Sequence, residues 1–209
     1  MLLTPAMQTV PLILGSGSPR RKQLLTETGI QFSVLTKNTN EDWPADLPIA
    51  EIAAYLANKK AAAFKEEAQQ SIILTADTVV CVGNKVLNKA ETHHQALEML
   101  RLLVGKTHQT YTGICIRYQD QVINATAVAY VTFADMSDEV LNHYINISKP
   151  FDKAGAYGIQ DWISLVGITE IKGSYYTVMG LPTHLVYAEL YRLYTSLPLK
   201  SHQIDGHLA

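Results

Sequence analysis

A glycine- and serine-rich turn, GSGSPRR at residues 15–21, follows a short apolar segment and precedes an expected helix. Ser18 has the sequence context of a helix N-cap, which places Arg20 and Arg21 in the first turn, where each cation costs about 0.3–1 kcal/mol against the helix dipole. Free backbone N–H groups, the hydroxyls of Ser16 and Ser18, and two guanidinium groups can together bind phosphate oxygens. The spacing is not that of a Walker motif, and an ordinary capped helix with exposed arginines is the alternative.

A second candidate is Asp77, which interrupts the apolar run IILTADTVVCV at residues 72–82. Aspartate is rarely buried without a partner. A partly desolvated carboxylate can bind a metal ion or act as a general base, whereas a structural aspartate would cap a bulge or a neighbouring turn. We favour the functional interpretation because α/β sheets place ligands at strand ends.

The third candidate is the segment KPFDKAGAYGIQ at residues 149–160, which contains two lysines, an aspartate and Gln160. Alone, it resembles a loop with solvated charges. Combined with the arginines and the carboxylate of Asp77, it provides the groups that a polyphosphate and its Mg²⁺ require. The histidines have no metal-ligand spacing: His93 and His94 are adjacent, so on a helix they point about 100° apart.

These residues must be positioned by alternating strands and helices. Strands are expected at 12–14, 31–36, 71–82, 110–118 and 122–134, and a second hairpin at 165–171 and 174–180. Helices are expected from residue 18 toward Gly29, at 48–68, from 93 to Gly105, at 137–147 and at 182–194. Hairpins mixed with strand–helix units predict an α/β fold with a mixed sheet flanked by helices.

The composition limits the classes of function. The chain has 209 residues, of which 47% are hydrophobic and 17% are charged, with a net charge of −2. This excludes a disordered chain and gives no sign of a nucleic-acid or membrane partner. Cys81 and Cys115 lie in apolar segments, and the N-terminus is a poor signal peptide, so we expect a cytoplasmic location. We expect one domain over residues 1–198 and a loosely ordered tail over 199–209.

Five blocks occur in an order typical of one family: SGSPRRKQLL, ADTVV, LNKAETHHQALEML, DKAGAYGIQ and GSYYTVMGLP. From about residue 12 to residue 193 the chain resembles the Maf-like (septum-formation-inhibitor-like) nucleoside triphosphate pyrophosphatases, and ADTVV with DKAGAYGIQ resembles the dTTP/UTP subgroup. The resemblance implies a fold similar to inosine triphosphate pyrophosphatase, with an elongated mixed sheet and two lobes around a cleft. It also implies hydrolysis of a nucleoside triphosphate to the monophosphate and pyrophosphate with a divalent metal, Mg²⁺ or Mn²⁺, and it is compatible with a homodimer.

The resemblance also assigns roles to residues. Asp77 would be the proton acceptor and, with Glu41, a metal ligand. Substrate preference would depend on Arg20, Thr78 and Gln160. The phosphate path would be lined by Ser16, Ser18, Arg21, Lys60, Lys89 and Lys153. A bound triphosphate would then supply the negative charge that the arginines lack at the helix N-terminus.

The chain departs from the family pattern at two positions. Asn40 replaces the first of a pair of acidic residues, of which Glu41 is the second, and Ala90 replaces a proline after Lys89. If the missing acid is a metal ligand or a catalytic carboxylate, Glu41 or Asp42 could substitute for it. The alternative function is therefore a nucleotide-binding regulator of cell division with weak or no turnover. Release of pyrophosphate distinguishes the two.

Overall fold

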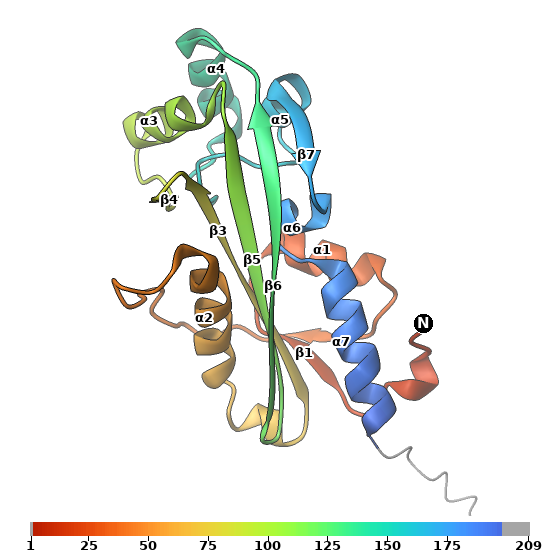
Figure 1. Cartoon of the computed structure of the whole chain (residues 1–209). Coiled ribbons are helices and arrows are strands. Elements are labelled where there is room, and N and C mark those ends of the chain that lie inside the picture. Colours follow the sequence, from red (N-terminus) through yellow and green to blue (C-terminus); the bar gives the residue numbers. More distant parts are fainter. Residues whose placement is uncertain (1, 198–209) are drawn as a thin grey trace, which may run out of the picture.

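The computed structural model describes residues 2–197, and the predicted tail at 199–209 lies outside them. An elongated mixed sheet runs the length of the molecule (Figure 1), with the strand order β2-β1-β3-β5-β6-β7 and with β4 paired to β3. The strands are β1 (Leu12–Leu14), β2 (Ser33–Val34), β3 (Ile72–Val82), β4 (Lys85–Leu87), β5 (Thr107–Tyr118), β6 (Gln121–Phe133) and β7 (Ile168–Lys172). The predicted α/β class and mixed sheet are confirmed.

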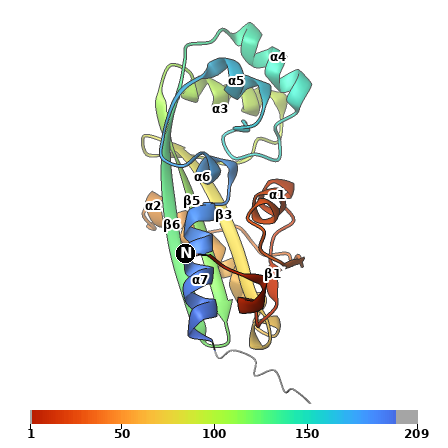
Figure 2. The same cartoon turned by 90° about the vertical axis from the view of Figure 1, so that its right-hand side faces the viewer.

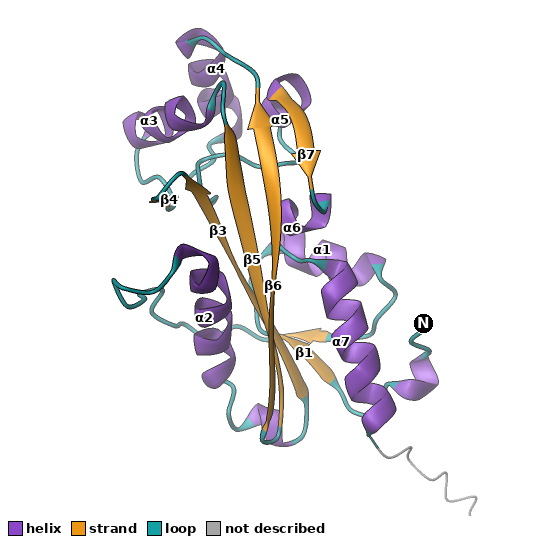
Figure 3. Ribbon diagram, viewed as in Figure 1, coloured by secondary structure: helices purple, strands orange, loops and turns teal. Residues whose placement is uncertain are grey.

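Helices cover both faces of the sheet (Figures 2 and 3), with α2 on one face and α7 on the other. The helices are α1 (Pro19–Glu27), α2 (Ile49–Ala62), α3 (His93–Leu103), α4 (Asp138–Ser148), α5 (Trp162–Gly167), α6 (Tyr175–Met179) and α7 (Thr183–Ser196), with short 3-10 turns at Pro5–Met7 and Glu67–Gln69. Helix α2 lies against the sheet backbone at Gly113 of β5, where a Cβ would lie 2.3 Å from the backbone nitrogen of Ala54. Glycine at this position lets α2 pack directly on the strand that neighbours β3.

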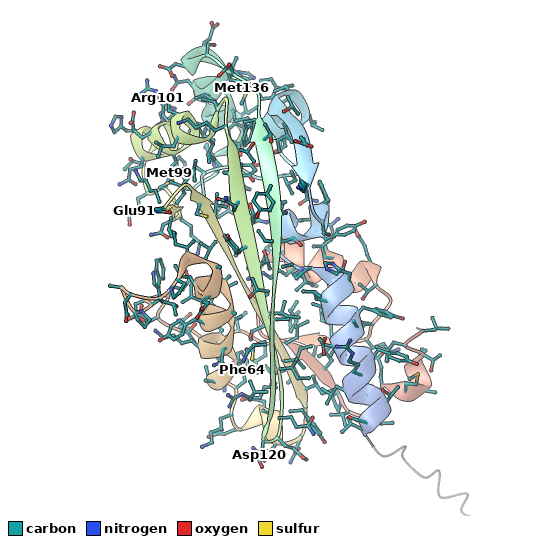
Figure 4. The ribbon with its side chains drawn as sticks, viewed as in Figure 1. Phe64, Glu91, Met99, Arg101, Asp120 and Met136 are labelled. Carbon is teal, nitrogen blue, oxygen red and sulfur yellow. The ribbon has the colours of Figure 1, made fainter. Side chains whose placement is uncertain are left out.

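The apolar core is divided between the two ends of the sheet. Figure 4 labels Asp120 in the β5–β6 turn at one end and Met136 and Arg101 near the other. The cluster at the Asp120 end joins β1, β3, β5, α1 and α7 and includes Leu14, Leu74, Ile114 and Leu190. The second cluster joins α3, α4 and α5 to the sheet and includes Val80, Leu100, Tyr144 and Ile163. The candidate residues lie where these two clusters meet.

The strand β3 changes its neighbour at this junction. It pairs in parallel with β1 over 72–74 and antiparallel with β4 over 80–82, while its other edge pairs continuously with β5. Residues 75–79 therefore have no strand beside them on the β1/β4 side, among the residues that the structure describes. This gap leaves Asp77 and Thr78 at an open edge in the middle of a long strand, which is where a ligand can reach them.

Most of the expected elements are confirmed, including the hairpin of β5 and β6. The second hairpin, at 165–171 and 174–180, is wrong, although part of its first segment is a strand. Residues 165–167 end α5, residues 168–171 lie in β7, which pairs with β6, and the second segment forms α6. Aromatic and β-branched residues at 175–178 favour a strand locally, but the backbone N–H of Thr177 bonds to the Ser174 carbonyl in a helical turn, which Gly180 ends at φ 112°. The expected helix at 48–68 also ends early, at Ala62.

Within residues 2–197, each helix is too short or too polar to span a bilayer.

Candidate functional site

Two adjoining cavities open at the gap in the sheet. One, of about 170 Å³, has an apolar part formed by Val80, Tyr157, Ile159, Val178 and Met179. The other, of about 480 Å³, lies along the loop from Gly15 to Arg21 and is lined mainly by polar and cationic side chains. The two cavities share Ser18, Arg20, Arg21, Glu41, Lys60, Lys89 and Asp152. We call the first cavity, after its apolar part, the apolar compartment, and the second cavity the cationic compartment.

The loop between β1 and α1 brings the arginines to these cavities. Ser18 caps α1 by accepting from the backbone N–H of Arg21 at 3.5 Å, as the sequence predicts. Gly15 has no room for a side chain, because a Cβ would lie 2.8 Å from Thr75 Cγ2 and 2.9 Å from Phe64 Cε2. The loop is thereby held tightly against β3, and the first turn of α1 faces the cavities.

Arg21 is fixed at three points. Its Nε donates to the Gly180 carbonyl at 2.9 Å, Nη1 to Ser16 Oγ at 3.3 Å and Nη2 to Thr78 Oγ1 at 3.2 Å. All three acceptors are neutral, and within residues 2–197 Arg21 has no carboxylate in salt-bridge contact. Burial lowers the pKa of this guanidinium. The charges of Asp77 and Glu41 favour this cation without contacting it, so a half-buried guanidinium bonded only to neutral acceptors favours binding of an anion beside it.

The carboxylates of the site are joined by lysines. Asp77 is 8% exposed and forms an ion pair with Lys60, which also contacts Glu41 at 2.7 Å. Glu41 contacts Lys89 as well, at 3.3 Å. Burial alone would raise the pKa of Glu41, but the hydrogen bond and charge of Lys60, with the charge of Lys89, lower it overall. Asp77 lines a third cavity, with Glu41, Thr78 and Lys89, rather than either of the two described above.

The loop that follows α4 forms the opposite wall. Asp152 Oδ2 accepts from Arg20 Nη1 at 3.1 Å, so an ion pair crosses from this loop to α1. Lys153 lies 2.9 Å from Asp152 and 3.6 Å from Asp161. Behind them, the hydroxyl of Tyr144 donates to Asp161 at 2.6 Å. The wall is thus tied both to α1 across the opening and to α4 behind it.

Gln160 is the predicted residue that does not join the group. It is exposed and lines a separate hollow of about 380 Å³ with Leu165 and Tyr175. Ile159 is shared by this hollow and the apolar compartment. The remaining predicted residues lie around the cavities at the gap: Ser16, Ser18, Arg20, Arg21, Glu41, Lys60, Asp77, Thr78, Lys89 and Lys153.

Sequence reasoning missed two residues that shape the site. Gly180 accepts a hydrogen bond from Arg21 through its carbonyl, and its position after a short helix is a recognisable C-cap signal. Thr112 is fully buried on β5 and contacts Thr78 at 3.0 Å. A hydroxyl in the otherwise apolar segment TGICI was the only signal for it.

Asp77 and Glu41 are the possible ligands of a metal ion at this site. Within the described residues no group of three or more His, Cys, Asp and Glu side chains has a metal-binding arrangement. Mg²⁺, however, is commonly held by one or two carboxylates together with substrate phosphates. Asp77 and Glu41, which meet at the ammonium group of Lys60, fit a site of this kind.

A buried carboxylate, a set of cations and an adjoining apolar compartment define a site of the kind that binds a nucleotide. The sequence model of the family described as Maf-like protein matches residues 11–193. The chain therefore belongs to the Maf family.

Individual relatives agree with this assignment. The dTTP/UTP pyrophosphatase of Bacteroides thetaiotaomicron is 43% identical over 184 residues, which cover 87% of this chain and 95% of the relative. The protein of the same name from Cytophaga hutchinsonii is 41% identical over 201 residues, covering 96% and 92%. That from Flavobacterium psychrophilum is 40% identical over 190 residues, covering 90% and 97%.

Proposed function

We propose that this protein hydrolyses nucleoside triphosphates, dTTP and UTP in particular, to the nucleoside monophosphate and pyrophosphate. The observation that carries the proposal is the buried carboxylate of Asp77 at the gap in the sheet, paired with Lys60, whose side chain lines both compartments. The names of the relatives, all dTTP/UTP pyrophosphatases, support the same reaction and the same substrates.

The two compartments suggest how a nucleotide is oriented. The base enters the apolar compartment, beside Thr78 and Val80. The triphosphate extends along the loop of Ser16 and Ser18 into the cationic compartment. Arg20 and Lys89 lie on both compartments and can follow the phosphate chain. Arg21, which has no carboxylate in salt-bridge contact within residues 2–197, gains a phosphate oxygen as a direct partner.

In this proposal Asp77 is the general base. A water molecule beside the α-phosphorus gives its proton to the Asp77 carboxylate as it attacks, and pyrophosphate leaves in line. Lys60 and Lys89, together with the arginines, stabilise the charge on the phosphate oxygens and on the leaving group. Their present carboxylate partners, Glu41 above all, are exchanged for phosphate oxygens when substrate binds.

Asp77 and Glu41 are the residues that would hold a divalent metal ion, Mg²⁺ or Mn²⁺. When bound, such an ion neutralises phosphate charge. Asn40 itself is occupied elsewhere: its side-chain amide donates to Asp42 at 3.0 Å, and Asp42 pairs with Lys59. Glu41 and Asp42 are the candidates to substitute for the acid that the family carries at position 40, and we favour Glu41 because it contacts Lys60 beside Asp77.

Other expectations accompany the proposal. Gln160 reaches the base only from the neighbouring hollow, so its role in substrate preference requires movement of the loop after Tyr157. A cytoplasmic location and a homodimer are compatible with the reaction. Sedimentation velocity and cell fractionation test these two expectations directly.

A panel of nucleoside triphosphates with Mg²⁺ or Mn²⁺, assayed separately for pyrophosphate and orthophosphate, tests the proposal. We expect pyrophosphate from dTTP and UTP, its loss in Asp77→Asn, and a large reduction in Glu41→Gln. Asp120→Asn, in the distant β5–β6 turn, is the matched control and should keep full activity. Tight binding of UTP without any product would instead favour the nucleotide-binding regulator, the second candidate, to which the departure at Asn40 points.

A further inference from the structure

A chain of hydroxyl groups lies behind the apolar compartment. Arg21 Nη2 donates to Thr78 Oγ1 at 3.2 Å, and Thr78 Oγ1 lies 3.0 Å from Thr112 Oγ1. Thr112 Oγ1 in turn lies 2.7 Å from the carbonyl oxygen of Thr177 on α6. Thr78 and Thr112 are directly opposed on β3 and β5, so the sheet register fixes their separation.

The direction of each hydrogen bond in this chain follows from its two ends. A carbonyl oxygen can only accept, so the single proton of Thr112 is donated to Thr177. Because Thr112 has no second hydroxyl proton, Thr78 is the donor and Thr112 the acceptor in the hydrogen bond between the two hydroxyls. At the near end a guanidinium can only donate, so Thr78 accepts from Arg21.

Thr78 therefore faces the cavity as an acceptor. Its only proton points inward to Thr112, and one of its two lone pairs is used by Arg21, which leaves one lone pair for a ligand. Gly180 keeps this position accessible, because a Cβ on Gly180 would lie 3.4 Å from Thr78 Oγ1. The lining of the apolar compartment includes both residues.

We propose that Thr112 is a positioning residue that makes Thr78 a hydrogen-bond acceptor, so that Thr78 selects bases with an N3–H group and rejects cytosine. The inference rests on the proposed function and explains its substrate class. Uracil and thymine carry an N3–H group, from which Thr78 can accept a hydrogen bond. Cytosine carries a lone pair on N3, so binding it would bring two lone pairs together and leave both unpaired.

Thr112 acts only through Thr78. It is fully buried and lines none of the cavities at the gap. Replacing it with valine keeps its shape and removes its hydroxyl, which frees the Thr78 hydroxyl to rotate and to donate as well as accept. The Thr177 carbonyl still accepts from the backbone N–H of Gly180 at 3.2 Å, so the change does not leave that carbonyl unpaired.

The first test compares kcat/KM for UTP and CTP in wild type and Thr112→Val. We expect the UTP/CTP ratio to fall by about 10- to 100-fold, the range that corresponds to one unpaired buried polar group, and Thr112→Ser to restore it. The matched control is Thr110→Val, two residues away on the same strand, whose buried hydroxyl is not part of the chain that joins Arg21, Thr78 and Thr112. It should leave the ratio unchanged. An unchanged ratio in Thr112→Val overturns the inference.

A second test needs no variant. N3-methyl-UTP, which lacks the N3 proton, should bind wild-type protein far more weakly than UTP, while 5-methyl-UTP, with its methyl group on another edge, should bind as UTP does. Calorimetric titration gives these affinities even if Thr112→Val does not fold or the protein does not turn over. Equal affinity for UTP and N3-methyl-UTP overturns the inference. If no nucleotide yields pyrophosphate, the proposed function is overturned. The comparison of affinities still tests the inference, because it does not depend on turnover.

Discussion

Replacing Tyr144 with phenylalanine tests how the wall formed by residues 152–161 is held in place. Tyr144 is fully buried on α4, and its hydroxyl makes two hydrogen bonds to this wall. It donates to Asp161 Oδ2 at 2.6 Å and accepts from the backbone N–H of Gly158 at 3.2 Å. Burial, together with the hydrogen bond to Asp161, raises the pKa of Tyr144, so the hydroxyl stays protonated in both roles.

The cost can be worked out from these two bonds. A hydrogen bond to a charged acceptor contributes about 1.5–3 kcal/mol, and an unpaired buried N–H costs about 1–3 kcal/mol. Because Asp161 keeps its contact with Lys153, the lower part of each range applies. We therefore expect Tyr144→Phe to lower the free energy of unfolding by about 3 kcal/mol.

Urea unfolding followed by circular dichroism at pH 7 measures this change. The matched control is Tyr130→Phe, a tyrosine on β6 whose side chain is 39% exposed, and it should change stability by less than about 0.5 kcal/mol. We also expect KM for UTP to rise in Tyr144→Phe, since Asp161 positions Lys153 at the cavity. A loss of less than about 1 kcal/mol would show that the Tyr144 hydroxyl does not hold this wall.

Two further predictions concern single side chains. Arg20→Ala should raise KM for UTP or lower kcat without changing stability, because an exposed ion pair such as Arg20–Asp152 contributes at most about 1 kcal/mol. A variant that loses stability but keeps full activity would contradict this prediction. Burial lowers the pKa of His108 to about 4, below its unfolded value near 6.5, so the unfolded chain binds more protons between these values. The free energy of unfolding should fall by up to about 3 kcal/mol as the pH drops from about 6.5 to about 4. In urea titrations, His108→Gln should make the free energy of unfolding depend less on pH over this range. An equal dependence in the variant would exclude His108 as its cause.

The sequence predicts those parts of the fold in which local and tertiary preferences agree. The Ser18 cap, the buried strand around Asp77 and the β5–β6 hairpin each have a local signal that the packing reinforces. The segment at 174–180 is different. Its residues favour a strand, but Thr177 is buried against β5 and its carbonyl accepts from Thr112, which holds the segment as a helical turn.

The composition of the site was predictable, whereas its geometry was not. The arginines and Asp77 could be selected by residue type, because cations and a carboxylate in separate segments suggest a phosphate ligand, whereas Lys60 was assigned only through the family resemblance. No local sequence pattern predicts that β3 pairs with β1 before Asp77 and with β4 after it. The gap between these two pairings depends on strands that are far apart in the sequence. Two other features could not be predicted from the sequence for the same reason. They are the place of Gln160 in the neighbouring hollow and the cross-strand contact of Thr78 with Thr112.

Hydrolysis in ¹⁸O-labelled water tests the central claim most directly. With UTP and a divalent metal, mass spectrometry of the products should find one labelled oxygen in UMP and none in pyrophosphate, since the activated water attacks the α-phosphorus. Asp77→Asn should form neither product. Label in pyrophosphate, or formation of UDP and orthophosphate, would contradict the account, because the attacked phosphorus would then not be the one that we place beside Asp77.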